Sequence, residues 1–172
     1  EKNVGSLVVP VLEGSKVFLL EVQSLLINSS FGMPRRVVQG FDKVRLEIIT
    51  AIIEKKMDIN IGNLDLFINI PGGIGIKDTS ADLAVVMSII SVIKDVAISQ
   101  KIAAIGELGL RGELRKVSFV VKRLRELEKL GFIGVYVSES NRREIEKEKF
   151  KMKIIYLSNL NELMERMKWD GL

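Results

Sequence analysis

Residues 70–84 read Ile-Pro-Gly-Gly-Ile-Gly-Ile-Lys-Asp-Thr-Ser-Ala-Asp-Leu-Ala, and this stretch decides the fold. An apolar strand leads into it, three glycines form a turn, and a polar cluster opens an apolar helix. In α/β proteins this arrangement commonly holds a phosphate site or a nucleophile, because unpaired backbone N–H groups converge where the helix starts. The pattern makes residues 70–84 a candidate active site.

The glycine turn also has a purely structural interpretation. Gly72, Gly73 and Gly75 allow a tight turn and a close approach of two backbones. Asp78 and Asp82 oppose phosphate binding, because carboxylates at a helix N-terminus already satisfy its partial positive charge and repel an anion. Asp82 is better explained as a helix cap or as the partner of a basic residue. A structural turn is therefore favoured over a phosphate site.

Length and composition narrow the function classes. At 172 residues, 47% of them hydrophobic and 28% charged, the chain fits one globular domain. It has no cysteine and no histidine, which excludes disulfides, thiolate and imidazole metal sites, and histidine-dependent catalysis. A Ser-Lys pair or carboxylates remain as conceivable catalytic groups.

The net charge of +4 and the pI near 9.3 are compatible with nucleic-acid binding. Compositions rich in Lys, Glu and Ile are also typical of heat-adapted proteins. No apolar run approaches the roughly 20 residues of a membrane span. We expect an intracellular, cytoplasmic protein.

Apolar periodicity and turn residues predict the elements. Strands are expected over residues 6–12, 16–27, 35–39, 64–70, 102–108, 113–117, 133–137 and 154–157, and helices over 42–57, 80–94, 118–130, 141–149 and 159–168. This order predicts an α/β (α+β) domain with a mixed sheet flanked by helices. Asp42 and Ser118 are expected to cap helices, and the buried stripe of the first helix is predicted to hold Val44, Ile48, Ala51 and Ile52.

Two blocks resemble the proteolytic domain of Lon-type proteases. Residues 77–82, Lys-Asp-Thr-Ser-Ala-Asp, match the block that reads Lys-Asp-Gly-Pro-Ser-Ala-Gly in Lon and supplies its serine. Residues 106–112, Gly-Glu-Leu-Gly-Leu-Arg-Gly, match the block after which Lon places its lysine, nine residues on. The resemblance puts Ala81 at the nucleophile position and Val121 at the base position. Neither side chain can attack a carbonyl or take a proton, so a pseudo-protease without catalytic residues is implied.

An active peptidase is the first alternative. It would use Ser80 with Lys122 or Lys77. A slip of one residue turns a helical side chain by about 100°, and both partners would have to slip in compatible directions.

Four collinear motifs resemble the C-terminal Lon-like domain of the RadA (Sms) family of bacterial DNA-repair proteins. They are residues 8–14 (Val-Val-Pro-Val-Leu-Glu-Gly), 34–36 with 40–46 (Pro-Arg-Arg and Gly-Phe-Asp-Lys-Val-Arg-Leu), 79–84 (Thr-Ser-Ala-Asp-Leu-Ala) and 106–115 (Gly-Glu-Leu-Gly-Leu-Arg-Gly-Glu-Leu-Arg). The resemblance covers residues 5–141, and a missing dyad is typical of that family. It implies one domain over residues 1–172, with the Lon proteolytic-domain-like fold related to ribosomal protein S5 domain 2.

The same resemblance implies a longer parent protein. An N-terminal zinc finger and a RecA-like ATPase would precede this domain, with residues 1–5 as the remnant of a linker. ATP, magnesium and zinc would belong to those missing domains, and no cofactor is expected here. The family forms hexameric rings, binds single-stranded DNA and promotes branch migration, with a recombinase as a further partner. The Lon-like domain would be a ring scaffold that adds DNA contacts.

Five basic residues are the candidate DNA contacts: Arg35, Arg36, Lys43, Arg45 and Arg115. Adjacent Arg35 and Arg36 point to opposite faces of a strand, so one of them is expected to pair with an acid such as Glu47 or Asp42. Only two aromatic residues, Phe31 and Phe41, lie near these charges in the sequence, so base stacking is poorly supported. Binding should therefore be mainly electrostatic and weaken steeply with salt.

A second basic group, Lys122, Arg123, Arg125, Arg142 and Arg143, alternates with glutamates and is interpreted as solvated helix surface or subunit contact. Two further alternatives stay open. One is a purely structural ring module without nucleic-acid affinity. The other is a Lon-like domain from another ATPase family, such as the magnesium-chelatase-like proteins of DNA uptake.

Overall fold

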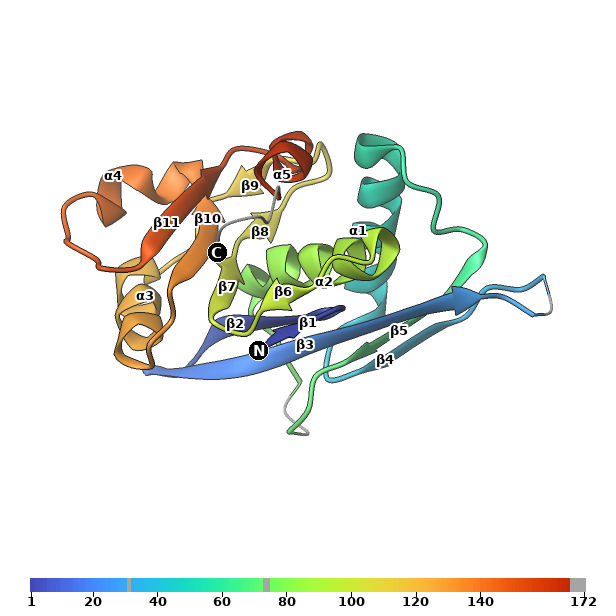
Figure 1. Cartoon of the computed structure of the whole chain (residues 1–172), viewed down its shortest axis with the longest axis horizontal. Helices are drawn as coiled ribbons and strands as arrows, with labels where there is room; N and C mark the ends of the chain where they lie inside the picture. Colours follow the sequence, from blue (N-terminus) through green and yellow to red (C-terminus); the bar gives the residue numbers. More distant parts are fainter. Residues whose placement is uncertain (31, 73–74, 168–172) are drawn as a thin grey trace.

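A seven-stranded mixed sheet organises the computed structural model, which describes residues 1–30, 32–72 and 75–167 (Figure 1). The strand order is β11-β10-β7-β2-β3-β5-β4. The strands are β2 (Ser6–Glu13), β3 (Lys16–Asn28), β4 (Arg36–Gln39), β5 (Leu64–Asn69), β7 (Ile102–Ile105), β10 (Gly134–Ser138) and β11 (Lys153–Leu157).

The long strand β3 joins the two halves of this sheet. Its first part pairs antiparallel with β2 as the predicted hairpin, with Glu13 opposite Lys16 and Gly14 in the turn at φ 59°. Its second part, from Gln23 to Asn28, pairs antiparallel with β5. The other neighbours, β4–β5, β2–β7, β7–β10 and β10–β11, run parallel. The sheet is therefore mixed, as predicted.

One face of the sheet carries α1 (Lys43–Met57), α2 (Asp82–Lys94) and α5 (Leu160–Arg166) over the larger apolar core. The short helix η1 (Thr79–Ala81) leads into α2. Every residue of α2 from Asp82 to Ser91 is buried, including the predicted stripe of Leu83, Val86, Met87 and Ile90. This burial fixes the position of the preceding loop, because α2 cannot shift without opening the core.

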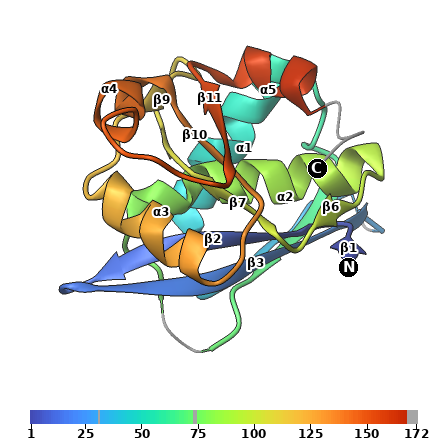
Figure 2. The same cartoon turned by 60° about the vertical axis from the view of Figure 1, so that its left-hand side comes forward.

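The opposite face is covered only at its β2–β7–β10 end within the described residues. There α3 (Val120–Lys129), η2 (Glu139–Asn141) and α4 (Arg142–Ile145) close a second core. Figures 1 and 2 draw no helix over this face of β3, β5 and β4. Leu25, Phe67 and Val37 lie side by side across these three strands, and Leu25 is 54% exposed. We call these three residues the open apolar row.

Two small sheets lie outside the main one. The strands β8 (Glu107–Leu108) and β9 (Leu114–Arg115) form the expected hairpin around the turn at residues 109–112. The strand β1 (Lys2–Asn3) pairs antiparallel with β6 (Ile98–Ser99). Residues 1–5, expected to be a linker remnant, are thus held against the domain, and Gly5 N also donates to the Ser91 hydroxyl at 2.8 Å.

The first helix begins at its predicted cap but buries a different face. Asp42 accepts a hydrogen bond from Arg45 N at 2.6 Å, whereas Val44 is 68% exposed and Ala51 is exposed. The buried residues are Leu46, Ile49, Thr50, Ile52 and Ile53. Of the predicted stripe, Ile52 is buried and Ile48 is partly buried against the larger core, whereas the prediction was wrong at Val44 and Ala51. Apolar residues occur on several sides of this helix, and periodicity alone does not choose between them.

Helix ends also differ from the predictions. Phe119, with a left-handed φ of 54°, precedes α3 in place of the Ser118 cap. The helix expected over residues 141–149 ends at Ile145. The last helix was expected to reach Lys168, and that residue, like Phe31 and Gly73, lies outside the described residues.

Candidate functional site

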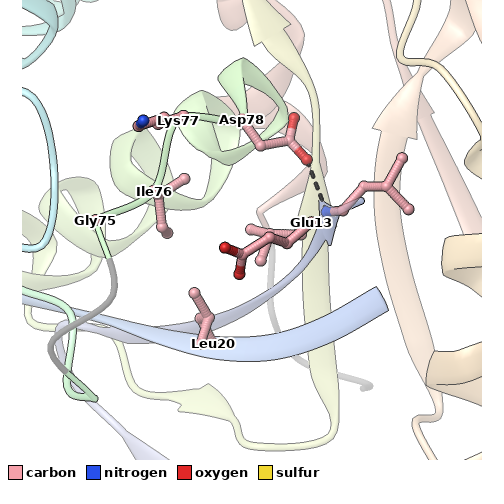
Figure 3. A pocket seen from close by; sticks show the side chains of 8 residues that line it. Glu13, Leu20, Gly75, Ile76, Lys77 and Asp78 are labelled. Carbon is pink, nitrogen blue, oxygen red and sulfur yellow. Dashed lines mark hydrogen bonds between the residues drawn. The ribbon is translucent and has the colours of Figure 1, made fainter. Parts of the chain in front are cut away.

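The loop between β5 and α2 is tied to strand β2 by the Asp78 side chain. One carboxylate oxygen accepts from Ser80 N at 3.0 Å, and the other accepts from Leu12 N at 3.0 Å (Figure 3). Burial disfavours the charged form of Asp78, but hydrogen bonds from Arg123 and the two backbone N–H groups outweigh it and lower its pKa. Asp78 therefore acts as an ionised cap that anchors the loop.

Arg123 reaches this loop from α3 and is buried, with a side chain only 2% exposed. Its Nη1 lies 2.5 Å from Asp78 Oδ2, 2.8 Å from Ser80 Oγ and 2.9 Å from the Pro10 carbonyl oxygen. Its Nε donates to the carbonyl of Ser118 at 3.0 Å. A single guanidinium thus joins β2, the glycine loop and the start of α3.

The interpretation of Arg123 as solvated helix surface is wrong. Val120 and Leu127, which are fully buried, lie three positions before and four after it. That spacing places Arg123 on the buried stripe of α3. This helical period could have identified the buried position of Arg123 from the sequence. The charged residues next to it led instead to the interpretation as exposed surface.

The two dyad positions of the Lon resemblance hold apolar side chains, one fully buried and the other partly buried. Ala81 is fully buried and Val121 packs at the edge of the second core. Ser80 is buried as well, and its hydroxyl is held by Arg123. An arginine guanidinium only donates hydrogen bonds and stays protonated in proteins, so it cannot serve as the base for a serine.

Neither lysine of the alternative dyad is placed at Ser80. The Lys122 ammonium donates to the Ser15 carbonyl, and Lys77 is exposed and extends away from Asp78 in Figure 3. Among the hydrogen bonds of the described residues, none joins a lysine to Ser80. The Ser80 hydroxyl is therefore buried, and no described lysine is placed to take its proton.

A second buried ion pair fixes the start of α2. Asp82 has no exposed surface and accepts from Arg45 Nε at 3.0 Å, from Arg45 Nη2, and from Leu108 N at 2.9 Å. Arg45 also donates to the Leu108 carbonyl at 2.7 Å, and its hydrogen bond with Asp82 raises its pKa. Of the two roles that the sequence suggested for Asp82, a helix cap or the partner of a basic residue, the structure shows the second.

Two hollows flank the loop. The larger, of about 360 Å³, lies between the start of α1 and residues 76–82, and Asp42, Arg45 and Lys77 line it. The smaller, of about 130 Å³, lies against β2 and β3, with Glu13, Leu20 and Gly75 around it (Figure 3). Within the described part of the chain, no three His, Cys, Asp or Glu side chains are grouped as metal ligands.

The remaining DNA candidates differ in how their charge is balanced. Arg35 pairs with Asp65 at 2.8 Å, and not with Glu47 or Asp42. Arg115 lies 3.6 Å from Glu107 and 3.5 Å from Glu113.

Arg36 and Lys43 form no ion pair with any carboxylate that the structure describes. Arg36 donates to the backbone carbonyls of Leu64 at 2.6 Å and Ile61 at 3.3 Å, which are neutral acceptors. Lys43 is exposed at the first turn of α1, and no carboxylate of residues 1–30, 32–72 or 75–167 pairs with it. Apart from a hydrogen bond from Arg36 to the Arg35 carbonyl, no hydrogen bond in that part of the chain joins two of the five candidates.

No helix in the described part of the chain combines the length and the apolar character that crossing a bilayer requires.

Comparison with known proteins gives two kinds of match. A family model described as "Subunit ChlI of Mg-chelatase" matches residues 28–141. The DNA repair protein RadA of Aquifex aeolicus is 40% identical over 161 residues, which are 94% of this chain and 35% of the relative. RadA of Helicobacter pylori is 42% identical over 133 residues (77% and 30%), and RadA of Bacillus subtilis is 35% identical over 139 residues (81% and 30%).

These matches decide between the two families that the motifs left open. The chelatase description alone would also fit a magnesium-chelatase-like protein, whereas relatives aligned over 77–94% of this chain are RadA proteins. The chain spans about a third of the length of the curated relatives it matches. The resemblance to RadA is confirmed: the chain belongs to the RadA family of DNA-repair proteins, and its residues 28–141 belong to the domain family of the Mg-chelatase subunit ChlI.

Proposed function

We propose that this chain is the non-proteolytic, Lon-like scaffold domain of a RadA-type DNA-repair ATPase. In the parent protein it supports a hexameric ring and contacts single-stranded DNA during branch migration, in the cytoplasm and with a recombinase as a further partner. ATP, magnesium and zinc act in domains outside this chain. The observation that carries the proposal is the pair of apolar residues, Ala81 and Val121, at the dyad positions of the resemblance. The neighbouring Ser80 hydroxyl is held by the buried Arg123, which cannot act as its base.

Labelling with a fluorophosphonate tests the loss of proteolysis. We expect no covalent adduct, because Ser80 is buried and held by a group that cannot take its proton. The Ser80→Ala variant is the matched control. An adduct that forms on the wild-type chain and disappears in this variant would establish the Ser-Lys peptidase instead.

For DNA contact, the charge balance favours Arg36 and Lys43 over the other three candidates. Arg45 is committed to the buried Asp82, and Arg35 and Arg115 have carboxylate partners. A phosphate at Arg36 or Lys43 would not have to displace a carboxylate. These two side chains can therefore neutralise the phosphates of single-stranded DNA without breaking an existing ion pair.

Titration with a labelled single-stranded oligonucleotide at several salt concentrations tests this contact. We expect the double variant Arg36→Glu with Lys43→Glu to bind more weakly and to lower the slope of log K against log salt by about 1.4, at about 0.7 per lost phosphate contact. Lys94→Glu, at the far end of α2, is the matched control. If the wild-type chain forms its oligomer yet binds no DNA at low salt, the purely structural ring module is correct.

The open apolar row supports a subunit contact. Leu25 and Val37 expose about half of their side chains, and Arg35 stacks over Phe67 at 5.7 Å beside them. Contiguous exposed apolar residues on one face are typical of protein interfaces. Sedimentation should give the mass of a hexamer, and Leu25→Glu should reduce it, whereas Leu110→Glu on the β8–β9 turn should not. A monomer at every concentration would contradict ring assembly by this chain.

A further inference from the structure

Strand β11 forms one edge of the main sheet, and no strand of the described residues pairs with its outer side. Lys153 N donates inward to the Ile133 carbonyl at 2.9 Å. Alternate residues of a parallel strand bond to the same neighbour, so the N–H and C=O groups of Ile154 and Tyr156 point away from β10. Among the backbone hydrogen bonds of the described residues, none satisfies these outward groups. The edge therefore offers a pattern of donors and acceptors that fits an extended chain.

A hollow of about 380 Å³ lies directly beside this edge. Ile154 and Tyr156 form its side on β11, and Ile145, the last residue of α4, and Phe150 form part of the other side. Neighbouring strands lie about 4.8 Å apart, and alternate side chains of a strand point to one face. A strand added to β11 would place a side chain over this hollow, next to Ile154 and Tyr156. These four side chains form the apolar part of the hollow, which can hold an apolar side chain, and charged residues form the rest of its lining.

The charge around the edge is positive. Glu146 and Glu148 line the hollow, but Arg142 holds the first at 2.9 Å and Arg125 holds the second at 2.6 Å. Four exposed lysines near the edge have no carboxylate partner within the described residues: Lys147, Lys149, Lys151 and Lys153. Complementary charge speeds and orients association, so this surface suits an acidic partner.

The aromatic rings favour a peptide over a nucleic acid. The Arg125 guanidinium covers one face of Phe150 at 4.4 Å, and the Arg142 guanidinium covers one face of Tyr156 at 3.9 Å. Single-stranded nucleic acids bind by stacking bases on free aromatic faces. A free strand edge instead pairs with the backbone of a peptide, and the adjacent hollow selects its alternate side chains.

We propose that the outer edge of β11 binds an extended acidic peptide segment of another protein, which adds a strand to the sheet and places an apolar side chain in the adjacent hollow. This contact goes beyond the scaffold and DNA functions proposed above and depends on neither.

Fluorescence anisotropy with a labelled peptide of alternating Glu and Phe residues tests the proposal on this chain. We expect saturable binding at low salt. Two further peptides carry N-methyl groups on one or the other set of alternate amides. Only the set that faces β11 loses its hydrogen bonds, so one methylated peptide should bind about tenfold or more weakly and the other should bind like the parent.

Variants of the chain test the same contact from the other side. Lys149→Glu with Lys153→Glu should weaken the peptide about tenfold, and the matched control Lys94→Glu should not. Ile154→Pro removes an outward N–H without removing a bond to β10, and it should also weaken binding while circular dichroism shows a folded chain. The Arg36 and Lys43 variants should leave the peptide affinity unchanged, which separates this contact from DNA binding.

Three results would overturn the proposal. One is the absence of saturable peptide binding at low salt. Another is equal affinity for the parent and both methylated peptides, which would mean attraction between charges without strand pairing. The third is displacement of the peptide by a single-stranded oligonucleotide of similar affinity, which would make the surface a nucleic-acid site.

Discussion

Replacing Arg123 by Met should destabilise the domain strongly. Methionine keeps an apolar stem of similar length, but it leaves Asp78 without its guanidinium and removes donors from Ser80, Pro10 and Ser118. Breaking a buried ion pair by removing one partner costs about 3–5 kcal/mol. Asp78 is 17% exposed and keeps two backbone donors, which favours the lower limit, while the abandoned acceptors add to the loss. We expect a decrease of about 3–4 kcal/mol in the free energy of unfolding.

Urea denaturation followed by circular dichroism measures this loss. Arg125→Met is the matched control, because this neighbour lies on the exposed side of α3 and its ion pairs should contribute less than about 1 kcal/mol. The double variant Arg123→Met with Asp78→Asn should be less damaged than the two single losses added together, because the two residues share one network. If Arg123→Met costs no more than Arg125→Met, the buried network does not hold the loop and the reasoning is refuted.

Three other changes test the same region. The pKa of Asp78 is lowered in the fold, so its carboxylate stabilises the protein at pH values above the ordinary carboxylate pKa of about 4. This stabilisation is lost as the pH falls further and the carboxylate takes up a proton. The difference in unfolding free energy between the wild type and Asp78→Asn should therefore shrink between about pH 5 and pH 3. Arg45→Met should lower the free energy of unfolding, measured by urea denaturation, by about 3–5 kcal/mol. Adding Asp82→Leu should restore part of this stability, because it removes the unpaired buried carboxylate. A double variant less stable than Arg45→Met alone would contradict this expectation. Gly40→Ala should lower the melting temperature through a loss of about 1–3 kcal/mol, because Gly40 has a φ of 78° and a Cβ would lie 2.9 Å from the Ile70 carbonyl oxygen; an unchanged melting temperature would exclude that strain.

Features encoded by neighbouring residues were predictable. Glu13 and Gly14 mark the β2–β3 hairpin, Asp42 caps α1, and Gly131 follows α3 with a φ of 78°, as its C-terminal glycine.

Features that depend on distant residues were not predictable. The pairing of β1 with β6 joins two short segments far apart in the chain, and neither has a period long enough to recognise. The partners of Arg35 and Arg123 were likewise fixed by tertiary packing: Asp65 lies on the neighbouring strand, and Asp78 lies 45 residues before Arg123, in the loop that leads into η1. A charged side chain on a helix is exposed in most proteins, so composition argued against the buried position that Arg123 takes.

The central position of β2 also has a kinetic consequence. β2 pairs at once with β3 through a tight turn, but its other edge waits for β7, where Ala103 lies opposite Val8. Parallel pairing of such distant segments must first overcome a large loss of chain entropy, which slows folding. Until β7 docks, the early hairpin presents an apolar strand with unpaired N–H and C=O groups, and this is the species most able to associate with other chains. Aggregation during refolding should therefore be set by how quickly residues 102–105 reach the middle of the sheet.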